Sequence, residues 1–210
     1  TNATYATYIR CHDDIGWAIT DEDAGALGLS GAAHRAFLSD FYDGSYPGSF
    51  ARGVLFQENP ETGDKRIAGS FAALAGLEAG RAVDRILLGH ALIASFGGIP
   101  LIYMGDELAM VNDHGYLDVP EHAHDSRWIN RPAMDWDRAA RASADPVTPE
   151  GRVLHGTRAI LAARRSCDRL HGGHPTEILD CGNAALLAFA RRAPQGGMLA
   201  LPPYGRVWLS

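Results

Sequence analysis

The sequence predicts a mixed α/β fold in which a helix joins two parallel strands, and two observations support this. The first is an apolar helical pattern over residues 82–96 that ends at Gly97 and leads into a second apolar run, residues 99–104. A short apolar run without alternation is typical of a strand buried on both faces, as in parallel sheets. The second is that both expected strands, residues 5–11 and 99–104, are followed by acidic residues. Spacing alone fits both a (β/α)8 barrel and a doubly wound sheet.

The first expected strand ends at three adjacent polar residues, His12, Asp13 and Asp14. Strand interiors avoid adjacent carboxylates, because buried like charges repel each other and lose their water. Such a cluster is tolerated where a strand ends in a polar cleft, which is also where chemistry is done.

The segment between the two strands predicts a small inserted subdomain over residues 16–68. Thr20 is a good N-cap for one helix, and Ser30 for a second over residues 31–42. Residues 58–66 have the Pro and Gly punctuation of a hairpin tip. A subdomain is favoured over a simple loop, since structureless loops of this length are uncommon.

The remaining elements follow the second strand. Residues 109–147 are polar and predict a long loop, after which Thr148 and Pro149 begin another helix. Short apolar runs over residues 184–192 and 197–203 predict the start of a β-rich C-terminal domain. His90, on an apolar helix face, is expected to be a hydrogen-bonded core residue.

Composition argues against several classes of protein. The net charge of -6 argues against a nucleic-acid surface, and the three cysteines have no CxxC spacing that would indicate a zinc site. The longest apolar stretch, residues 91–105, is too short for a membrane span. The first residues do not resemble a signal peptide, so we expect a cytoplasmic protein; because the sequence does not begin with Met, an upstream signal stays open.

Four motifs, RCHDDIGW, GSFARGV-FQ-NP-TGD-R, GGIPLIYMGDE and DSRW--RP (a dash stands for any residue), occur in this order along the chain. Together they resemble the C-terminal half of the amylosucrases, a branch of the α-amylase superfamily (glycoside hydrolase family thirteen). The resemblance implies the C-terminal part of a TIM barrel. It assigns strand seven and its catalytic end to residues 1–15, an inserted subdomain to 16–68, the remaining barrel to 69–170, and the start of a C-terminal β-sandwich to 171–210.

The reaction implied by the resemblance is retaining transfer of glucose from sucrose to an α-1,4-glucan, with release of fructose and with no cofactor or metal. Retention uses a nucleophile and an acid/base, both carboxyl groups. In the amylosucrases a third acid holds two hydroxyls of the sugar in the transition state. By its place in the motif this acid is Asp13, and His12 is expected to donate to the same sugar.

Four further residues match substrate-binding positions of the amylosucrases. Asp14 matches a residue that contacts the neighbouring ring, and Arg127 matches an arginine at the floor of the sugar pocket. Arg66 matches an acceptor-site arginine on the inserted subdomain, and Arg35 is expected further along the acceptor path.

The resemblance also places the nucleophile and the acid/base on strands that precede Thr1. The 210 residues are therefore expected to need the N-terminal part of the same barrel as a partner and to be inactive alone. Three alternatives stay open: a sucrose hydrolase, another enzyme of the superfamily such as a trehalose synthase-like isomerase, and a noncatalytic glucan-binding protein.

Overall fold

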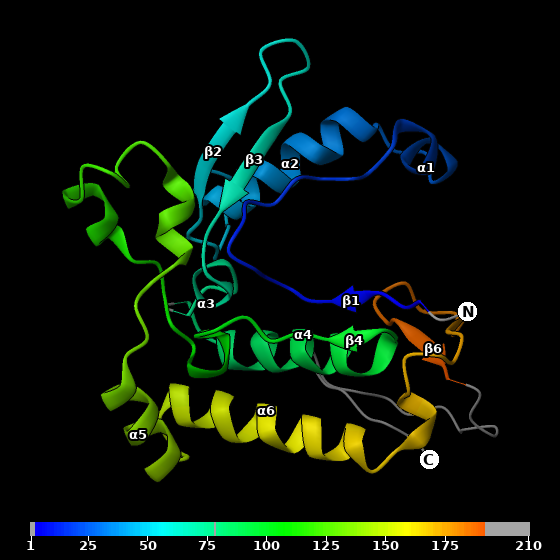
Figure 1. Ribbon diagram of the computed structural model, residues 1–210. Coiled ribbons are helices and arrows are strands. Elements are labelled where there is room, and N and C mark those ends of the chain that lie inside the picture. The colour runs from blue at the N-terminus through cyan, green and yellow to red at the C-terminus, as the bar shows by residue number, and fades with distance from the viewer. Residues whose placement is uncertain (1–2, 78, 192–210) are drawn as a thin grey trace.

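The structure is a computed structural model that describes residues 3–77 and 79–191, and Figure 1 shows its mixed α/β architecture. The elements in chain order are β1 Ala6–Thr7, α1 Asp21–Ala26, α2 Gly31–Asp43, β2 Val54–Glu58, β3 Lys65–Ala68, α3 Phe71–Leu74, α4 Ala82–Phe96, β4 Ile99–Pro100, short 3₁₀ helices at Asp106–Leu108, His114–Asp118 and Ser126–Asn130, α5 Trp136–Ala144, α6 Pro149–Arg165, a 3₁₀ helix at Asp168–Leu170, β5 Glu177–Leu179 and β6 Ala188–Ala190.

Strands β1 and β4 pair in parallel, as the sequence predicts, with Ala6 opposite Ile99. Gly98 allows this approach: its φ of 71° is left-handed, and a Cβ there would overlap the carbonyl oxygen of Tyr5. The strands are much shorter than the predicted 5–11 and 99–104. The prediction that the second strand is buried on both faces is wrong, since Ile99 is 60% exposed. The reason is that β1 and β4 form a two-stranded sheet in the described part of the chain.

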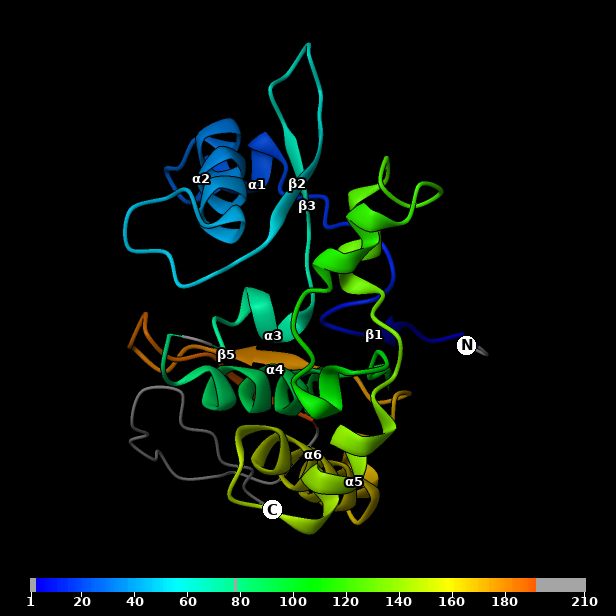
Figure 2. The same cartoon turned by 90° about the vertical axis from the view of Figure 1, so that its left-hand side faces the viewer.

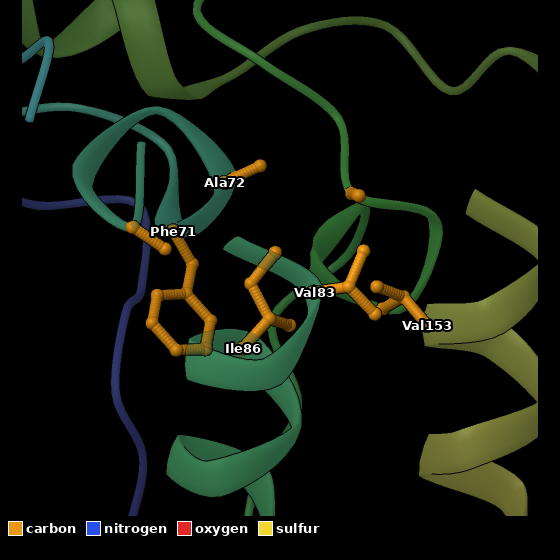
Figure 3. Packing of buried hydrophobic residues seen from close by; sticks show 7 residues of the cluster. Phe71, Ala72, Val83, Ile86 and Val153 are labelled. Atoms are coloured by element: carbon orange, nitrogen blue, oxygen red, sulfur yellow. The ribbon is translucent and has the colours of Figure 1, made fainter. Parts of the chain in front are cut away.

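Helices α4 and α6 lie side by side beneath this small sheet (Figure 1). Figure 3 shows the core at one end of α4, where Phe71 of α3, Ile86 of α4 and Val153 of α6 pack together. Phe71 and Ile86 are almost fully removed from solvent, and burial of side chains of this size contributes about 2 kcal/mol each. His90 lies in the interior as predicted, with its Nδ1 2.8 Å from Oγ1 of Thr157.

The inserted segment folds as predicted from its caps and turns. Thr20 and Ser30 accept hydrogen bonds from the first turns of α1 and α2. Strands β2 and β3 form an antiparallel hairpin, and α2 lies beside it (Figure 2). Ile15 exchanges backbone hydrogen bonds with Ile67 of β3, which joins the segment after the His-Asp-Asp cluster to the hairpin.

The prediction of a loop over residues 109–147 is wrong in part, because this segment contains α5 and two 3₁₀ helices. Helix α5 begins at the N-cap Asp135, which accepts from the backbone N–H of Arg138, and it buries Ala142. Apart from Trp136, the apolar side chains of this nine-residue helix are alanines, so its sequence reads as polar and resembles the loop around it.

The C-terminal part contains the antiparallel pair β5 and β6. The predicted strand over residues 184–192 is present as β6, and the one over residues 197–203 lies outside the described residues. Among the described helices, none has the length and apolar character needed to cross a bilayer.

Candidate active site

The parallel pairing of β1 with β4 puts the segments that follow both strands at the same edge of the sheet. Asp13, after β1, meets Arg127, which lies 114 residues later in the chain: its Oδ1 is 3.3 Å from Nη1 of Arg127. Arg131 Nη2 lies 3.8 Å from the same oxygen, and His12 Nε2 lies 3.5 Å from Oδ2. The Asp13 side chain is 48% exposed, so its carboxylate is accessible to a ligand.

Arg127 is held in place by two neighbours. Asp125 accepts from its Nε and Nη2, both at 2.9 Å, and the guanidinium lies 4.7 Å from the ring centre of Phe56 on β2. Hydrogen bonding by Arg127 lowers the pKa of the Asp125 carboxyl below its ordinary value. A bidentate pair of this kind fixes the plane of the guanidinium as well as its charge.

Asp14 pairs with a different arginine from Asp13. Its Oδ2 lies 3.1 Å from Nη1 of Arg66 on β3, and the Asp14 side chain is only 7% exposed, against 56% for Arg66. The two adjacent carboxylates therefore face different arginines, which separates their charges. The role of Asp14 and Arg66 in contacting a second sugar stays a prediction.

Arg35 lies on α2, away from Asp13. It donates to Asp64 at 2.7 Å, to Asp21 at 3.1 Å and to the carbonyl of Ile19 at 2.8 Å. It lines an open hollow of about 1190 Å³ between residues 16–20 and the hairpin, which Trp17 and Arg66 also line. The residues that line this hollow do not include His12, Asp13 or Arg127.

Three residues of the site were not singled out from the sequence. Arg131 lies in the same polar segment as Arg127, and Arg10 and Asn130 contact the backbone beside Asp13. The signal for Arg131 is its place four residues after Arg127 in one motif. Arg10 is the first residue of the RCHDDIGW motif, which is a signal for it, whereas Asn130 acts through a main-chain contact that leaves no side-chain pattern.

Asp106, in the segment after β4, lies in the interior near Arg10. Burial raises the pKa of its carboxyl from 3.8 to about 7, although the positive charge of Arg10 opposes the shift. Its neighbour Glu107 accepts the backbone N–H of Gly105 at 2.9 Å. This hydrogen bond holds the backbone of the turn after β4.

No group of three or more metal-ligating side chains converges in the part of the chain that the structure describes. Within the polar segment, His122 stacks on Trp128 with ring centres 3.5 Å apart, which makes it a packing residue.

The cluster around Asp13 is suited to binding neutral hydroxyl groups. An ionised carboxylate accepts short, strong hydrogen bonds, and His12 adds a ring nitrogen that can donate or accept. Asp14, the nearest acid in sequence, is paired and almost buried. Among the described residues, Asp13 is thus the accessible carboxylate of this cluster. A reaction that requires two carboxyl groups needs a further acid.

The chain is similar to known sugar phosphorylases. It is 30% identical over 115 residues to the glucosylglycerate phosphorylase of Escherichia coli strain K12. The matched segment covers 55% of this chain and 20% of that protein. The chain thus spans about a fifth of this curated relative's length. No family model matches it.

Among solved structures, the sucrose 6F-phosphate phosphorylase of Thermoanaerobacter thermosaccharolyticum superposes on 83% of this chain and 32% of its own, with a TM-score of 0.59 and 18% identity. The trehalose-6-phosphate hydrolase of Bacillus licheniformis covers 58% of this chain and 30% of its own, with a TM-score of 0.41 and 16% identity. The first likeness shows that this chain has the fold of about a third of sucrose 6F-phosphate phosphorylase.

Proposed function

We propose that this chain is part of a retaining glucosyl-transferring enzyme of the α-amylase superfamily, and that Asp13 stabilises its transition state. The observation that carries the proposal is the meeting of Asp13 with Arg127 at the edge where β1 and β4 end. Catalytic groups of α/β barrels lie at the carboxyl ends of parallel strands.

In this proposal the Asp13 carboxylate accepts hydrogen bonds from two hydroxyls of the glucosyl ring. These bonds strengthen as the ring flattens and gains positive charge, so they lower the barrier instead of only tightening substrate binding. Arg127 and Arg131 pair with the carboxylate, and His12 contacts an adjacent hydroxyl. The nucleophile and acid/base come from the N-terminal part of the same barrel.

The donor in this proposal is sucrose and the acceptor is an α-1,4-glucan, as the resemblance to the amylosucrases implies. Arg66 and Arg35 line the open hollow on the inserted subdomain, which supports an acceptor path there. The domain division goes with this proposal: residues 1–15 and 69–170 belong to the barrel, 16–68 to the inserted subdomain, and 171–210 to a C-terminal β domain.

A second candidate is a phosphorylase, in which inorganic phosphate takes the glucosyl unit. The similarity to glucosylglycerate phosphorylase favours it, and so does the fold shared with sucrose 6F-phosphate phosphorylase. The same role of Asp13 serves both candidates, because acceptor identity does not alter the transition state at the donor ring.

The test is to incubate the complete protein that contains this chain with sucrose or with glucosylglycerate, each with and without a glucan and with and without phosphate. Glucan-dependent release of fructose together with elongation of the glucan supports the first candidate. Phosphate-dependent formation of glucose 1-phosphate, from sucrose or glucosylglycerate, supports the second. Release of glucose and fructose in equal amounts, dependent on neither glucan nor phosphate, indicates a sucrose hydrolase, and no turnover of either sugar contradicts both candidates.

A further inference from the structure

The backbone that carries Asp13 lies outside the sheet. Strand β1 ends at Thr7, so the carbonyl groups of residues 11–13 have no strand to pair with. Backbone carbonyls inside a protein need donors, and here side chains supply them. Asn130 donates from Nδ2 to the carbonyl of Cys11 at 2.9 Å, and Arg131 donates from Nε to the carbonyl of His12 at 2.8 Å.

The third carbonyl, that of Asp13 itself, accepts a hydrogen bond from Nη2 of Arg10. The Nε of Arg10 donates to the carbonyl of Gly69 at 2.8 Å, so one guanidinium joins the Asp13 turn to the end of the hairpin. Arg10 is only 3% exposed. Burial lowers its pKa, and the neighbouring Cys11 and Asp106 oppose this shift.

Asn130 is as deeply buried as Arg10, with 2% of its surface exposed. Its Oδ1 has no hydrogen-bond partner among the described residues, which leaves the contact to Cys11 as the one that its side chain makes. Leaving a buried amide oxygen unpaired is costly. A smaller apolar residue would avoid that cost, so the contact to Cys11 is the feature that requires an amide here.

The ion pairs of the Asp13 carboxylate cannot fix its position by themselves. Both Arg127 and Asp13 are partly exposed, and water screens ion pairs of this kind so that they contribute little. The place of the carboxylate therefore depends on the backbone below it. Two buried side chains from different segments hold that backbone at successive points.

We infer that Arg10 and Asn130 are positioning residues for Asp13: their hydrogen bonds to the carbonyls of residues 13 and 11 set the place from which its carboxylate meets the sugar. The part of this inference that concerns kcat rests on the proposed function. Neither side chain touches the substrate, so both act through the backbone of the turn.

The test uses the complete enzyme and the variants Arg10→Met, Arg10→Lys and Asn130→Ala. We expect kcat to fall roughly 10- to 100-fold in Arg10→Met and Asn130→Ala with KM changed less than about threefold, because misplacement by about 1 Å costs this much. Arg10→Lys keeps the charge and one donor, and it should recover part of the loss. The matched control is Arg138→Met, which removes an arginine that donates to the carbonyls of Leu108 and Ala109, and it should retain the parent kcat.

A second readout does not depend on turnover: hydrogen exchange of the amides of residues 11–14. We expect faster exchange in Arg10→Met and Asn130→Ala, and parent rates in Arg138→Met. If the parent enzyme turns over no sugar, the proposed function fails, and exchange still decides whether the two residues hold the turn. Unchanged exchange, or faster exchange with unchanged kcat in an active enzyme, overturns the inference. If Arg10→Met does not fold, Asn130→Ala carries the test.

Discussion

Replacing His90 with Gln should remove a large part of the acid sensitivity of this fold. His90 is 1% exposed, and it lies on α4 against Thr157 of α6 and the ring of Phe71. Burial lowers its pKa from 6.5 to about 4, because the charged imidazolium loses its water. Gln keeps a side chain that can hydrogen bond to Thr157 and carries no titrating group.

The magnitude follows from the linkage between protonation and folding. Between pH 6.5 and about 4 the unfolded chain binds a proton at His90 and the folded chain does not. The free energy of unfolding therefore falls as the pH is lowered through this range. At about 1.4 kcal/mol for each pH unit, His90 contributes about 3 kcal/mol of stability that is present above pH 6.5 and absent below pH 4.

The assay is urea unfolding of the parent protein and the His90→Gln variant at several pH values from 4 to 7. Repacking around Gln changes the free energy of unfolding of the variant by the same amount at every pH. The informative quantity is therefore how the difference in unfolding free energy between parent and variant changes with pH. We expect the parent to lose about 3 kcal/mol relative to the variant between pH 6.5 and 4. A difference that stays constant over this range refutes the reasoning that His90 is buried in its neutral form.

Three further predictions concern other residues. For Asp106→Asn we expect the opposite dependence of stability on pH, because the pKa of Asp106 in the folded protein, about 7, lies above the ordinary 3.8. The parent should lose up to about 4 kcal/mol of unfolding free energy as the pH rises from 3.8 to 7. Urea unfolding should show that the variant lacks this loss. Gly98→Ala should lower the free energy of unfolding by roughly 2 kcal/mol or more, because its Cβ would meet Tyr5 and Thr7, whereas Gly63→Ala, also left-handed but in open space, should cost about 1 kcal/mol. The isolated 210-residue chain should release no fructose from sucrose, because the proposal places two of the three acids outside it; measurable release would contradict that placement.

Local chemistry made the hairpin and the helices α1, α2, α4 and α6 of this chain predictable. Thr20, Ser30 and Thr148 are side-chain caps that mark helix starts, and all three accept the expected backbone hydrogen bonds. The helix over residues 82–96 ends at Gly97 as its apolar pattern indicates. These features depend on residues within a few positions of one another, so the sequence contains the information directly.

The extents of the strands were less predictable, since a strand is defined by its neighbours. The apolar runs 5–11 and 99–104 have the composition of long strands, yet only two residues of each pair with the other. Ile99 and Leu101 stay exposed on the small sheet. The sequence pattern shows that a segment is apolar. It does not show which segment packs against it, because that segment lies elsewhere in the sequence.

The residues of the candidate site likewise include some that the sequence predicts and some that it does not. Asp13 and Arg127 were predicted from a resemblance, and the structure brings them within 3.3 Å. Asp14 is more buried than a residue that contacts substrate would need to be. Arg10 stands in the RCHDDIGW motif, but its role and that of Asn130 could not be predicted, because their partners are backbone carbonyls whose positions depend on tertiary structure.

Replacing Asp13 with Asn in the complete enzyme removes the negative charge on which the proposed role of Asp13 depends. Asn has almost the same shape and lacks the charge, so its hydrogen bonds to the sugar no longer strengthen as the ring becomes positive. We predict that kcat falls at least about a hundredfold, or roughly 3 kcal/mol in the barrier. A variant that retains most of the parent kcat would show that Asp13 does not stabilise the transition state.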